Sequence, residues 1–559
     1  MSLSDIGKPD LETPVLIVGG SLVGMSTALL LAHHGVPALM VEHHRGTAIH
    51  PRAALINQRT MEILRTVGVE QIVMKKSDEQ FDQDGAVMSV ETLAGKEIAY
   101  FIPNLNEGVR DVSPSVRVFI TQSLLEPLLK ARALELGAQL RYSTEMISFE
   151  QDADGVTAVI RDRDSGKTQT ARAQYMVAAD GSRSRIRESL GIGMRGRGVF
   201  SNSATIYFRA NVAPLLRGRN LSIIMVVNPT LRGFFRIEKP YQSGFLAVNT
   251  LGSPDHPDTD VTKDLNEERS RALVEAALGT HDVPVTIENV MPWQSTADVA
   301  DRFESGRVFL AGDAAHVMPW QSTADVAERF HDGRVFLAGD AAHVMPPYGG
   351  FGGNTGIADA HNLAWKLALV VRGKAGAELL STYEPERRPV AAFTVEQAYT
   401  RYVTRSAQYL GTSGMQKAEN DLNIELGYCY RSTAVISEAD DDGRGHENPR
   451  ESKGRPGTRA PHLFLDYEGR KISTLDLFGR NFVLLVGPGG QAWCDCAKDS
   501  KIDMDVHRIE EPGFADAYGI TASGAVLVRP DGFVAWRAKS SEEASSDALL
   551  RHVRAILNL

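Results

Sequence analysis

A glycine-rich turn, followed at a fixed distance by an acid, lies near the start of the chain and could bind a dinucleotide. The turn contains Ser21 and is surrounded by Gly19, Gly20 and Gly24. Glu42 lies 18 residues beyond the last glycine (42 − 24 = 18). Small residues let backbone amides approach a pyrophosphate, and a carboxylate at this distance accepts hydrogen bonds from a ribose. Ser21 replaces the middle glycine of G-x-G-x-x-G, so a purely structural turn remains the alternative.

Another turn that could bind a cofactor, the Gly-Asp turn of RVFLAGDAAHV, occurs in two copies. Residues 291–317 and 318–344 align without a gap, differ at three of 27 positions, and both contain RVFLAGDAAHV. Two units are too few for a stacked repeat fold, so this is a local tandem duplication. Only the second copy continues directly into PPYGGFGGNTG. We therefore predict that Gly339-Asp340 is the functional pair, that Gly312-Asp313 is redundant, and that the surplus near 304–330 loops out beyond the sheet.

The stretch PPYGGFGGNTG (346–356) has five glycines in eleven residues and precedes IADAHNLAWKLALVV, which has helical character. Glycines let backbone amides meet a flat ligand, and a helix N-terminus stabilises negative charge on it. The candidate cofactor contacts here are Pro346, Gly352, Gly353 and Asn354.

These residues must be held by strands and helices. VLIV (15–18) predicts a strand, 25–33 a helix ended by Gly35, and ALMVE (38–42) a second strand, which together form a βαβ unit. Asp180-Gly181 follows another strand, and Arg117 and Gln122 come just before and at the start of an amphipathic helix. Ligands of open α/β sheets bind at the carboxyl ends of strands. A surface arginine and an ordinary turn are the alternatives for each taken alone.

The composition and the order of segments predict several domains. At 559 residues the chain is too long for one core. We expect a discontinuous cofactor-binding domain (1–194 and 291–400), a β-rich substrate domain (195–290), a transition (401–455) and a C-terminal domain (456–559). Four phenylalanines of the β-rich part suit a polycyclic aromatic ligand, although a hydrophobic core explains them equally well: Phe208, Phe234, Phe235 and Phe245.

Charge and cysteine content narrow the partners and the location. The net charge of −10 argues against nucleic acid or anionic lipid. No apolar run of about 18 residues and no secretory signal appear, so we expect a cytoplasmic protein without a membrane partner. Three cysteines make neither a disulfide framework nor a four-ligand zinc site, and no metal centre is predicted. A monomer or a homodimer is expected.

Six stretches together resemble the FAD-dependent aromatic hydroxylases of the p-hydroxybenzoate hydroxylase type, most closely the branch acting on polyketides, such as the tetracenomycin and aklavinone hydroxylases. They are VGGSLVG, HPRAALINQRTMEILRTVGV, RVFITQSLLEPLL, AADGSRSRIR, RVFLAGDAAHVMPPYGGFGGNTGIADAHNLAWKLA and STYEPERRPVA. The resemblance implies an α/β fold, with a Rossmann-like FAD-binding domain, an inserted β-rich substrate domain and a C-terminal thioredoxin-like domain.

The resemblance also implies roles for the candidate residues. Glu42 would hold the adenosine ribose, and Arg117 and Gln122 would lie along a non-covalently bound FAD. Asp180-Gly181 would lie near the pyrophosphate, Gly339-Asp340 at the ribityl and phosphate side, and loop 346–354 against the flavin ring. Arg45, Arg52 and Tyr348 are candidates for substrate or flavin-loop contacts, with surface or packing roles as the alternative.

The implied reaction is hydroxylation of a polycyclic aromatic or phenolic substrate. NADPH, or NADH, would reduce the FAD, dioxygen would add at flavin C4a, and the hydroperoxide would pass oxygen to the ring. The cofactor then carries the chemistry, which agrees with the lack of a recognisable catalytic triad. Two alternatives remain: another flavoenzyme of this fold, such as a reductase or a halogenase, although no W-x-W-x-I-P stretch is present, or a flavin-fold protein disabled by the duplication.

The C-terminal segment contains two features that could mislead. VLLVGPGGQAW (483–493) resembles a second nucleotide turn, but no helix with a ribose acid about 20 residues later follows clearly, so we interpret it as a structural strand and loop. Cys494 and Cys496 form C-x-C rather than C-x-x-C. We therefore expect a thioredoxin-like tail that does not exchange disulfides.

Overall fold

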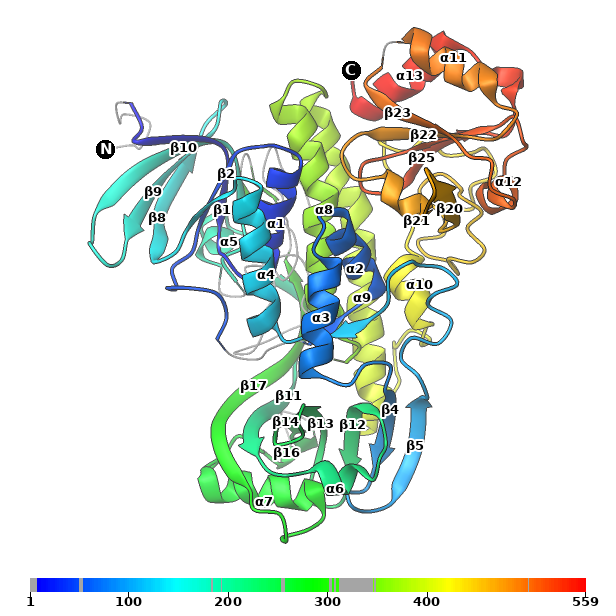
Figure 1. The fold of residues 1–559 in the computed structure, drawn as a ribbon. Coiled ribbons are helices and arrows are strands. Elements are labelled where there is room, and N and C mark those ends of the chain that lie inside the picture. Colours follow the sequence, from blue (N-terminus) through cyan, green and yellow to red (C-terminus); the bar gives the residue numbers. More distant parts are fainter. Residues whose placement is uncertain are drawn as a thin grey trace.

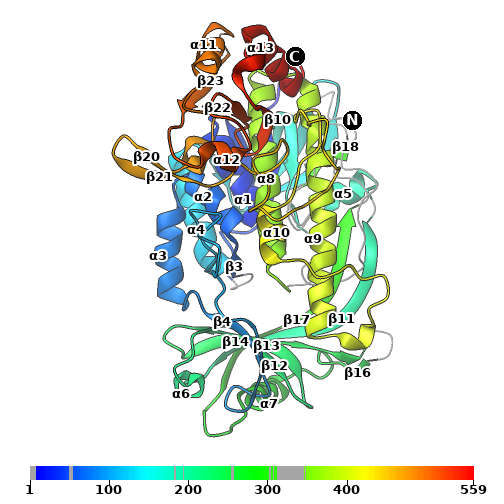
Figure 2. The ribbon, with the colours of Figure 1, turned by 90° about the vertical axis from the view of Figure 1, so that its right-hand side faces the viewer.

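The computed structural model of the 559-residue chain has three parts (Figure 1). It describes residues 8–49, 54–181, 184–192, 194–252, 257–300, 304–305, 308–310, 345, 348–500 and 502–559. A β-rich part lies at one end, a mixed α/β part in the middle and a smaller α/β part at the other end. The long helices α8 and α9 run through the middle part, and α9 reaches the β-rich part (Figure 2).

The middle part is built on a largely parallel sheet in the order β18-β19-β10-β1-β2-β7, with β8 and β9 added beside β10. These strands are β1 (Leu11–Val18), β2 (Ala38–Val41), β7 (Gln139–Arg141), β8 (Thr144–Gln151), β9 (Val156–Asp162), β10 (Thr168–Ala178), β18 (Glu304–Ser305) and β19 (Val308–Leu310). The predicted βαβ unit is confirmed, because β1 and β2 pair in parallel around α1 (Leu22–His33). The second half of β1 and all of β2 are buried, as expected for a parallel sheet covered on both faces.

Helices surround this sheet. Those of the middle part are α2 (Gln58–Thr66), α3 (Glu70–Gln80), α4 (Gln122–Glu135), α5 (Arg185–Ser189), α8 (Phe351–Val371), α9 (Tyr383–Arg405) and α10 (Asp421–Leu426). Helix α1 packs against α4 and α8. A short pair, β3 (Leu55–Ile56) and β6 (Val118–Phe119), and two 3-10 turns, η4 (Ala377–Thr382) and η5 (Gln408–Leu410), complete this part. No described helix is long and apolar enough to cross a membrane.

The β-rich part is one sheet in the order β17-β11-β14-β13-β12-β4-β5. Its strands are β4 (Ala86–Val90), β5 (Glu97–Ile102), β11 (Met194–Arg209), β12 (Leu221–Val227), β13 (Arg232–Glu238), β14 (Ser243–Asn249) and β17 (Thr286–Ala300). The predicted range 195–290 is therefore too narrow. Two strands come from residues 86–102 and one edge strand extends to residue 300, because pairing across a sheet joins segments that are distant in sequence.

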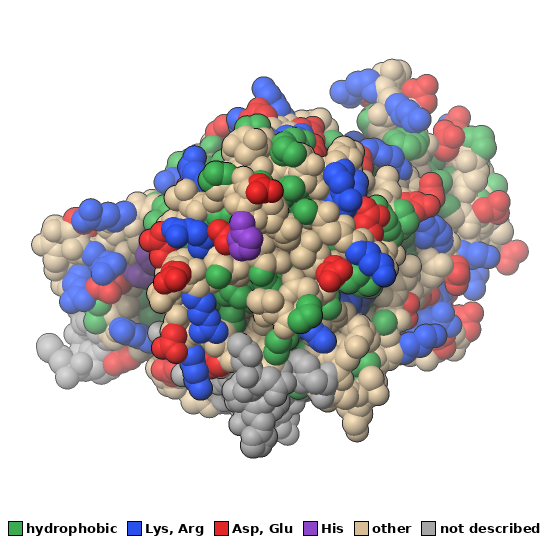
Figure 3. All heavy atoms as spheres, turned by 90° about the horizontal axis from the view of Figure 1, so that it is seen from below, with side chains coloured by type: hydrophobic (Ala, Val, Ile, Leu, Met, Phe, Trp, Pro, Cys, Tyr) green, Lys and Arg blue, Asp and Glu red, His purple; other side chains and the backbone are tan. Residues whose placement is uncertain are grey.

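Helix α7 (Glu267–Leu278) covers one face of this sheet and forms an apolar core with it. The short helix α6 (Ala213–Leu216) and the pair β15 (Leu251–Gly252) and β16 (Pro257–Thr259) lie at its margins. Seen from below, the outer surface carries interspersed basic and acidic side chains with only small apolar areas between them (Figure 3). The opposite face of the sheet is turned toward the middle part (Figure 2).

The C-terminal part has the thioredoxin-like topology that the resemblance implied. Its sheet has the order β23-β22-β24-β25, with β22 and β23 parallel and the other pairs antiparallel. The strands are β22 (Phe482–Val486), β23 (Met504–Arg508), β24 (Ala525–Val528) and β25 (Val534–Ala538), preceded by the hairpin β20 (Phe464–Tyr467) and β21 (Arg470–Ser473). The helices are α11 (Gln491–Ser500), α12 (Phe514–Tyr518) and α13 (Ser546–Leu557), with 3-10 turns η6 (Thr474–Leu477) and η7 (Ser541–Glu543). VLLVG is thus a central strand, as expected.

Candidate active site

The glycine-rich turn joins the carboxyl end of β1 to α1. Gly19 has a φ of +104°, and a Cβ there would lie 1.9 Å from the carbonyl oxygen of Ala179, so only glycine fits. A Cβ on Gly24 would lie 2.0 Å from the carbonyl oxygen of Gly19. Ser21 is the N-cap of α1, but its side chain accepts no hydrogen bond from the helix. The first-turn amides are therefore open to an anion such as a pyrophosphate.

Glu42 follows β2 and lies beside this turn. Its carboxylate is buried, and it accepts hydrogen bonds from the amides of Gly20 (2.6 Å) and His44 (2.7 Å). Its Oε1 also lies close to His43 Nδ1 (3.1 Å) and His44 Nδ1 (2.6 Å). Its Oε2 accepts only the Gly20 amide among the described residues, so this oxygen keeps a lone-pair position for a ribose hydroxyl. Among the described residues, Glu42, His43 and His44 form one cluster close enough to hold a metal, but its carboxylate already binds the amide of the turn.

Arg117 and Gln122 flank β6 and the start of α4, and both bind carboxylates. Buried Arg117 donates to Glu425 of α10 through Nε (2.9 Å) and Nη2 (2.7 Å). Gln122 donates to Glu126 (2.7 Å). Glu425 was not found from the sequence because it lies 308 residues from its partner. Contacts of Arg117 and Gln122 with FAD remain predictions.

Asp180-Gly181 follows β10, next to Ala179, whose carbonyl oxygen adjoins Gly19. Asp180 accepts a hydrogen bond from the Ser184 hydroxyl (2.6 Å), which also caps α5. Burial raises the pKa of Asp180 above its ordinary value, although the hydrogen bond from Ser184 opposes the shift. The turn after β10 and the turn after β1 therefore lie at the same edge of the sheet.

The glycine loop is shorter than predicted, because helix α8 begins at Phe351 and not at Ile357. Gly352, Gly353 and Asn354 are therefore in the first turn of the helix. Asn354 holds this turn: its amide donates to the carbonyl oxygens of Leu55 (2.9 Å) and Gly350 (2.6 Å). No side chain caps the helix N-terminus, so its amides are also open to a ligand.

The first copy of the duplication is part of both large sheets. Its opening residues extend β17 along β11, and Trp293 donates from its indole to the Thr205 hydroxyl (3.0 Å). Its Val308–Leu310 pairs in parallel with Met176–Ala178 of β10 as strand β19. The prediction that 304–330 loops out beyond the sheet is therefore wrong for β18 and β19, because an apolar strand gains hydrogen bonds at the sheet edge.

Several predicted site residues lie outside the part of the chain that the structure describes. They are Arg52, Gly312, Asp313, Gly339, Asp340 and Pro346. The assignment of Gly339-Asp340 as the functional pair therefore remains a prediction.

The face of the β-rich sheet turned toward the middle part carries aromatic side chains. Phe234 and Phe245 lie on this face, with ring centroids 5.9 Å apart, and Tyr207 lies 6.0 Å from Phe245. Phe208 and Phe235 point to the other face and pack in the apolar core under α7. The sequence treated the four phenylalanines alike, whereas the structure separates two candidate ligand contacts from two core residues.

Tyr348 links the glycine loop to this aromatic face. Its ring centroid lies 6.3 Å from that of Phe234 and 5.1 Å from that of Tyr402 of α9. Its hydroxyl accepts a hydrogen bond from the Asn249 amide (2.9 Å), and Asn249 accepts one from the Ser203 hydroxyl (2.9 Å). The sequence singled out Tyr348 but missed Asn249 and Ser203.

Two further arginines differ in their surroundings. Arg45 is exposed and forms an ion pair with Asp164 (3.2 Å), so in this structure it takes a surface role. Arg405 ends α9, is half-buried and lies over the Phe101 ring (5.5 Å). Within the described part of the chain, its guanidinium has no hydrogen-bond or ion-pair partner. Burial lowers the pKa of Arg405, while the negative charge of Asp421 acts in the opposite direction.

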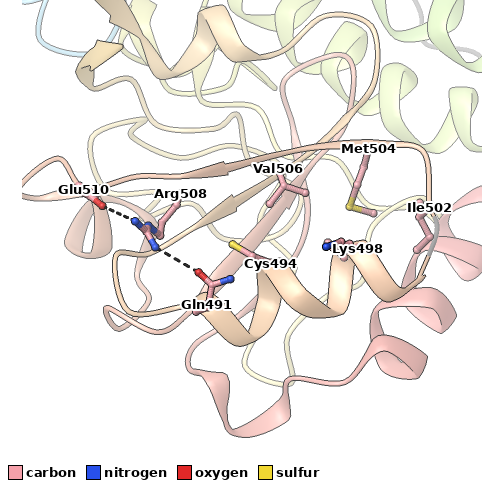
Figure 4. A pocket seen from close by; sticks show the side chains of 9 residues that line it. Gln491, Cys494, Lys498, Ile502, Met504, Val506, Arg508 and Glu510 are labelled. Carbon is pink, nitrogen blue, oxygen red and sulfur yellow. Dashed lines mark hydrogen bonds and ion pairs between the residues drawn. The ribbon is translucent and has the colours of Figure 1, made fainter. Parts of the chain in front are cut away.

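A groove of about 620 Å³ in the C-terminal part lies between α11 and β23 (Figure 4). Met504 and Val506 line its apolar centre, Cys494 faces it, and Lys498 and Arg508 lie toward its ends. Burial raises the pKa of the Cys494 thiol, which disfavours the reactive thiolate. This agrees with the expectation of a tail without disulfide exchange, which stays a prediction.

The fold and this geometry define a class of protein: a doubly wound α/β dinucleotide-binding protein with a β-rich substrate part. A family described as an FAD binding domain matches residues 12–320 and again 318–398. The second match begins with the first residue of the second copy. A family described as the C-terminal part of aromatic-ring hydroxylases matches residues 453–558.

Similar proteins and structures agree over almost the whole chain. A 4-methyl-5-nitrocatechol 5-monooxygenase of Burkholderia sp. is 49% identical over 98% of both chains. A tetracenomycin B2 monooxygenase-dioxygenase of Streptomyces olivaceus is 37% identical over 98% of this chain and 99% of its own. The structure of aklavinone-11 hydroxylase with FAD and aklavinone superposes with a TM-score of 0.88, at 33% identity over 99% of this chain and 100% of that one.

The chain therefore belongs to the FAD-dependent aromatic-ring hydroxylases, which confirms the resemblance seen in the sequence. It is an FAD-dependent monooxygenase. The open amides of α1 and α8, the fixed Glu42 carboxylate and the steric demand for glycine at position 19 fit such a cofactor.

Proposed function

We propose that the chain hydroxylates a compact phenolic ring that carries an ionised oxygen, with NADPH or NADH as the electron donor and dioxygen as the oxygen source. The observation that carries this proposal is an aromatic surface together with the Arg405 guanidinium, which has no hydrogen-bond or ion-pair partner among the described residues. Phe234, Phe245 and Tyr207 offer ring contacts. Tyr402, whose ring lies 5.1 Å from that of Tyr348, is followed by Arg405 within one turn of α9. A relative that is 49% identical is named for a nitrocatechol, and a nitro group makes a phenol more acidic.

Each residue of the chain then has a positional role. We propose that Glu42 holds the adenosine ribose and that the amides of α1 receive the pyrophosphate. The amides of α8 would stabilise negative charge on the ring system, and Arg405 would hold the substrate oxygen. FAD supplies the oxygen-activating chemistry when it is bound. The protein orients the ring and excludes water.

The substrate proposal is tested with two phenols of different size. Purified holoenzyme is mixed with 4-methyl-5-nitrocatechol or with a polycyclic phenol such as aklavinone, and NADPH consumption and product mass are recorded under labelled dioxygen. We expect faster NADPH oxidation and one labelled oxygen in the product of the nitrocatechol. Labelling of only the polycyclic phenol would support the second candidate, a polyketide hydroxylase, which the aklavinone-bound structure favours. Labelling of neither would contradict both.

The cofactor assignments are tested by FAD titration of the apoprotein. Replacing Glu42 with Ala removes a charged hydrogen-bond acceptor, worth about 1.5–3 kcal/mol, so we expect FAD to bind at least tenfold more weakly. Asp313→Ala and Asp340→Ala test the two copies of the Gly-Asp turn. Loss of FAD in Asp340→Ala alone would support the second copy, and loss in Asp313→Ala alone would assign the site to the copy that forms β19.

A further inference from the structure

The glycine loop is held from two sides. On the side of the middle part, Asn354 bonds Leu55 and Gly350, and it accepts a hydrogen bond from the amide of Asn57 (3.0 Å). On the side of the β-rich sheet, a chain of hydrogen bonds runs from Ser203 through Asn249 to Tyr348. The loop therefore bridges the cofactor-binding part and the substrate-binding sheet.

The hydrogen-bond chain is buried along its whole length. Ser203, Asn249 and Tyr348 are 0%, 5% and 5% exposed. Ser203 and Asn249 are opposite each other on β11 and β14, on the face that also carries Phe245. A ligand that rests on this aromatic face adjoins the same residues that hold the tyrosine. Burial makes the bonds costly to break, because an unpaired amide or hydroxyl loses its hydration as well.

The backbone next to Tyr348 is tied to the start of α8. Gly350 packs directly on Leu55, since a Cβ on Gly350 would lie 2.9 Å from that side chain, and its carbonyl oxygen accepts a hydrogen bond from the Asn354 side chain (2.6 Å). Asn354 lies in the first turn of α8, so a shift of Tyr348 that reaches Gly350 also acts on the start of that helix. The amides of that helix start are the groups that the proposed function directs toward the flavin.

We propose that Tyr348 is a positioning residue: its hydroxyl, held by Asn249, couples ligand binding on the β-rich sheet to the loop that faces the flavin. This inference rests on the proposed function. With the coupling intact, the two electrons of NADPH reduce dioxygen so that one oxygen atom enters the ring and the other leaves as water. With the coupling broken, dioxygen takes both electrons and two protons and leaves as hydrogen peroxide.

The test compares holoenzyme variants that lose one polar group. Tyr348→Phe and Asn249→Ala each break the chain, and the double variant tests whether they act together. Thr205→Val is the matched control, since Thr205 lies on the same strand as Ser203 but bonds Trp293 and not the loop. The measurements are peroxide released per NADPH, the change in flavin absorbance when substrate binds, and the affinity of the apoprotein for FAD.

We expect Tyr348→Phe to raise the peroxide share about fivefold, the ratio that one neutral hydrogen bond supports. The substrate-induced absorbance change should fall, while FAD affinity stays within about twofold of the unaltered protein. Asn249→Ala should raise the peroxide share to a similar extent, and the double variant should raise it no further than either single variant. Unchanged peroxide release in both single variants, or an equal rise in Thr205→Val, would overturn the inference. If the unaltered protein hydroxylates no phenol, the proposed function fails instead.

Discussion

The middle part of the molecule meets its two neighbours through interfaces of different chemistry. Against the C-terminal part it places buried charges: Glu386 of α9 accepts from Arg529 (2.5 and 2.9 Å), Lys366 (2.8 Å) and Asn362 (2.7 Å). Lys366, Glu386 and Arg529 have fully buried side chains. Against the β-rich sheet it places aromatic rings and the hydrogen-bond chain through Asn249, with further polar bonds such as those from Lys239 to the carbonyl oxygen of Asp78 (2.9 Å) and from Arg232 to that of Ser406 (3.2 Å).

The difference shows how each interface serves the enzyme. A buried charge network is satisfied in one geometry only, because a small displacement leaves charges without partners. Aromatic contacts lose little when rings slide or tilt, so the β-rich sheet can adapt to a ligand. The C-terminal part thus acts as a fixed support behind α8 and α9, whereas the sheet forms the adaptable side of the proposed substrate site.

The largest expected effect comes from removing the centre of the charge network. Glu386→Ala leaves Lys366 and the Arg529 guanidinium buried with fewer partners, and breaking such a network costs about 3–5 kcal/mol. We expect a large fall in the thermal midpoint and early proteolytic release of the C-terminal part. Retained stability would mean that the two parts are held by packing instead.

A middle-sized effect is expected on the aromatic side. Phe234→Ala removes a half-buried ring that contacts Phe245 and Tyr348, and we expect a loss of about 2 kcal/mol in unfolding free energy together with a raised KM for the phenol. Phe464→Ala is the control, since this phenylalanine is 46% exposed. A raised KM in the control, or none in Phe234→Ala, would remove Phe234 from the substrate site.

Acid should weaken the charged interface and not the aromatic one. Burial opposes ionisation of Glu386, but Arg529 and Lys366 outweigh it and hold the pKa of this carboxyl well below its ordinary value of 4.5. Its stabilising contribution is therefore complete well above pH 4.5 and is lost progressively as the pH falls below it. The stability difference between the unaltered protein and Glu386→Gln should shrink between pH 7 and about pH 3.5. A difference independent of pH would contradict the assigned charge state.

The smallest effect is expected from an exposed ion pair. It tests whether the charge network between the middle part and the C-terminal part stabilises the protein because it is buried. Arg508 and Glu510 form an exposed ion pair beside the C-terminal groove (3.0 Å). Exposed pairs contribute about 0–1 kcal/mol, so Glu510→Ala should change the thermal midpoint very little. A loss similar to that of Glu386→Ala would show that exposed pairs also carry this protein's stability.

Local patterns predicted the fold of the first βαβ unit and its glycine turn well. Gly19, Gly24 and Glu42 follow from spacing along one βαβ unit. Phe234 and Phe235 could also have been separated, because neighbouring residues of a strand point to opposite faces. The start of α8 was missed because glycines in its first turn oppose a helix, and the tertiary bonds of Asn354 outweigh that tendency.

Other features depend on contacts between distant segments and could not be predicted from the sequence. The pairing of β4 with β12, the ion pair of Arg117 with Glu425 and the bond of Asn249 to Tyr348 each join segments separated by about a hundred residues or more. The periodicity of residues within one segment does not indicate which distant segment it contacts. The sequence also could not predict which copy forms β19, since both copies contain the same strand sequence.

Beside β10, the sheet has one edge position, and β19 fills it with Val308–Leu310. Val335–Leu337 has the same sequence, within an identical RVFLAGDAAHV. The strand sequence is therefore redundant: a mutation that disrupts it in one copy leaves it unchanged in the other. Removal of the 27 residues of one copy would leave one such strand for this one position.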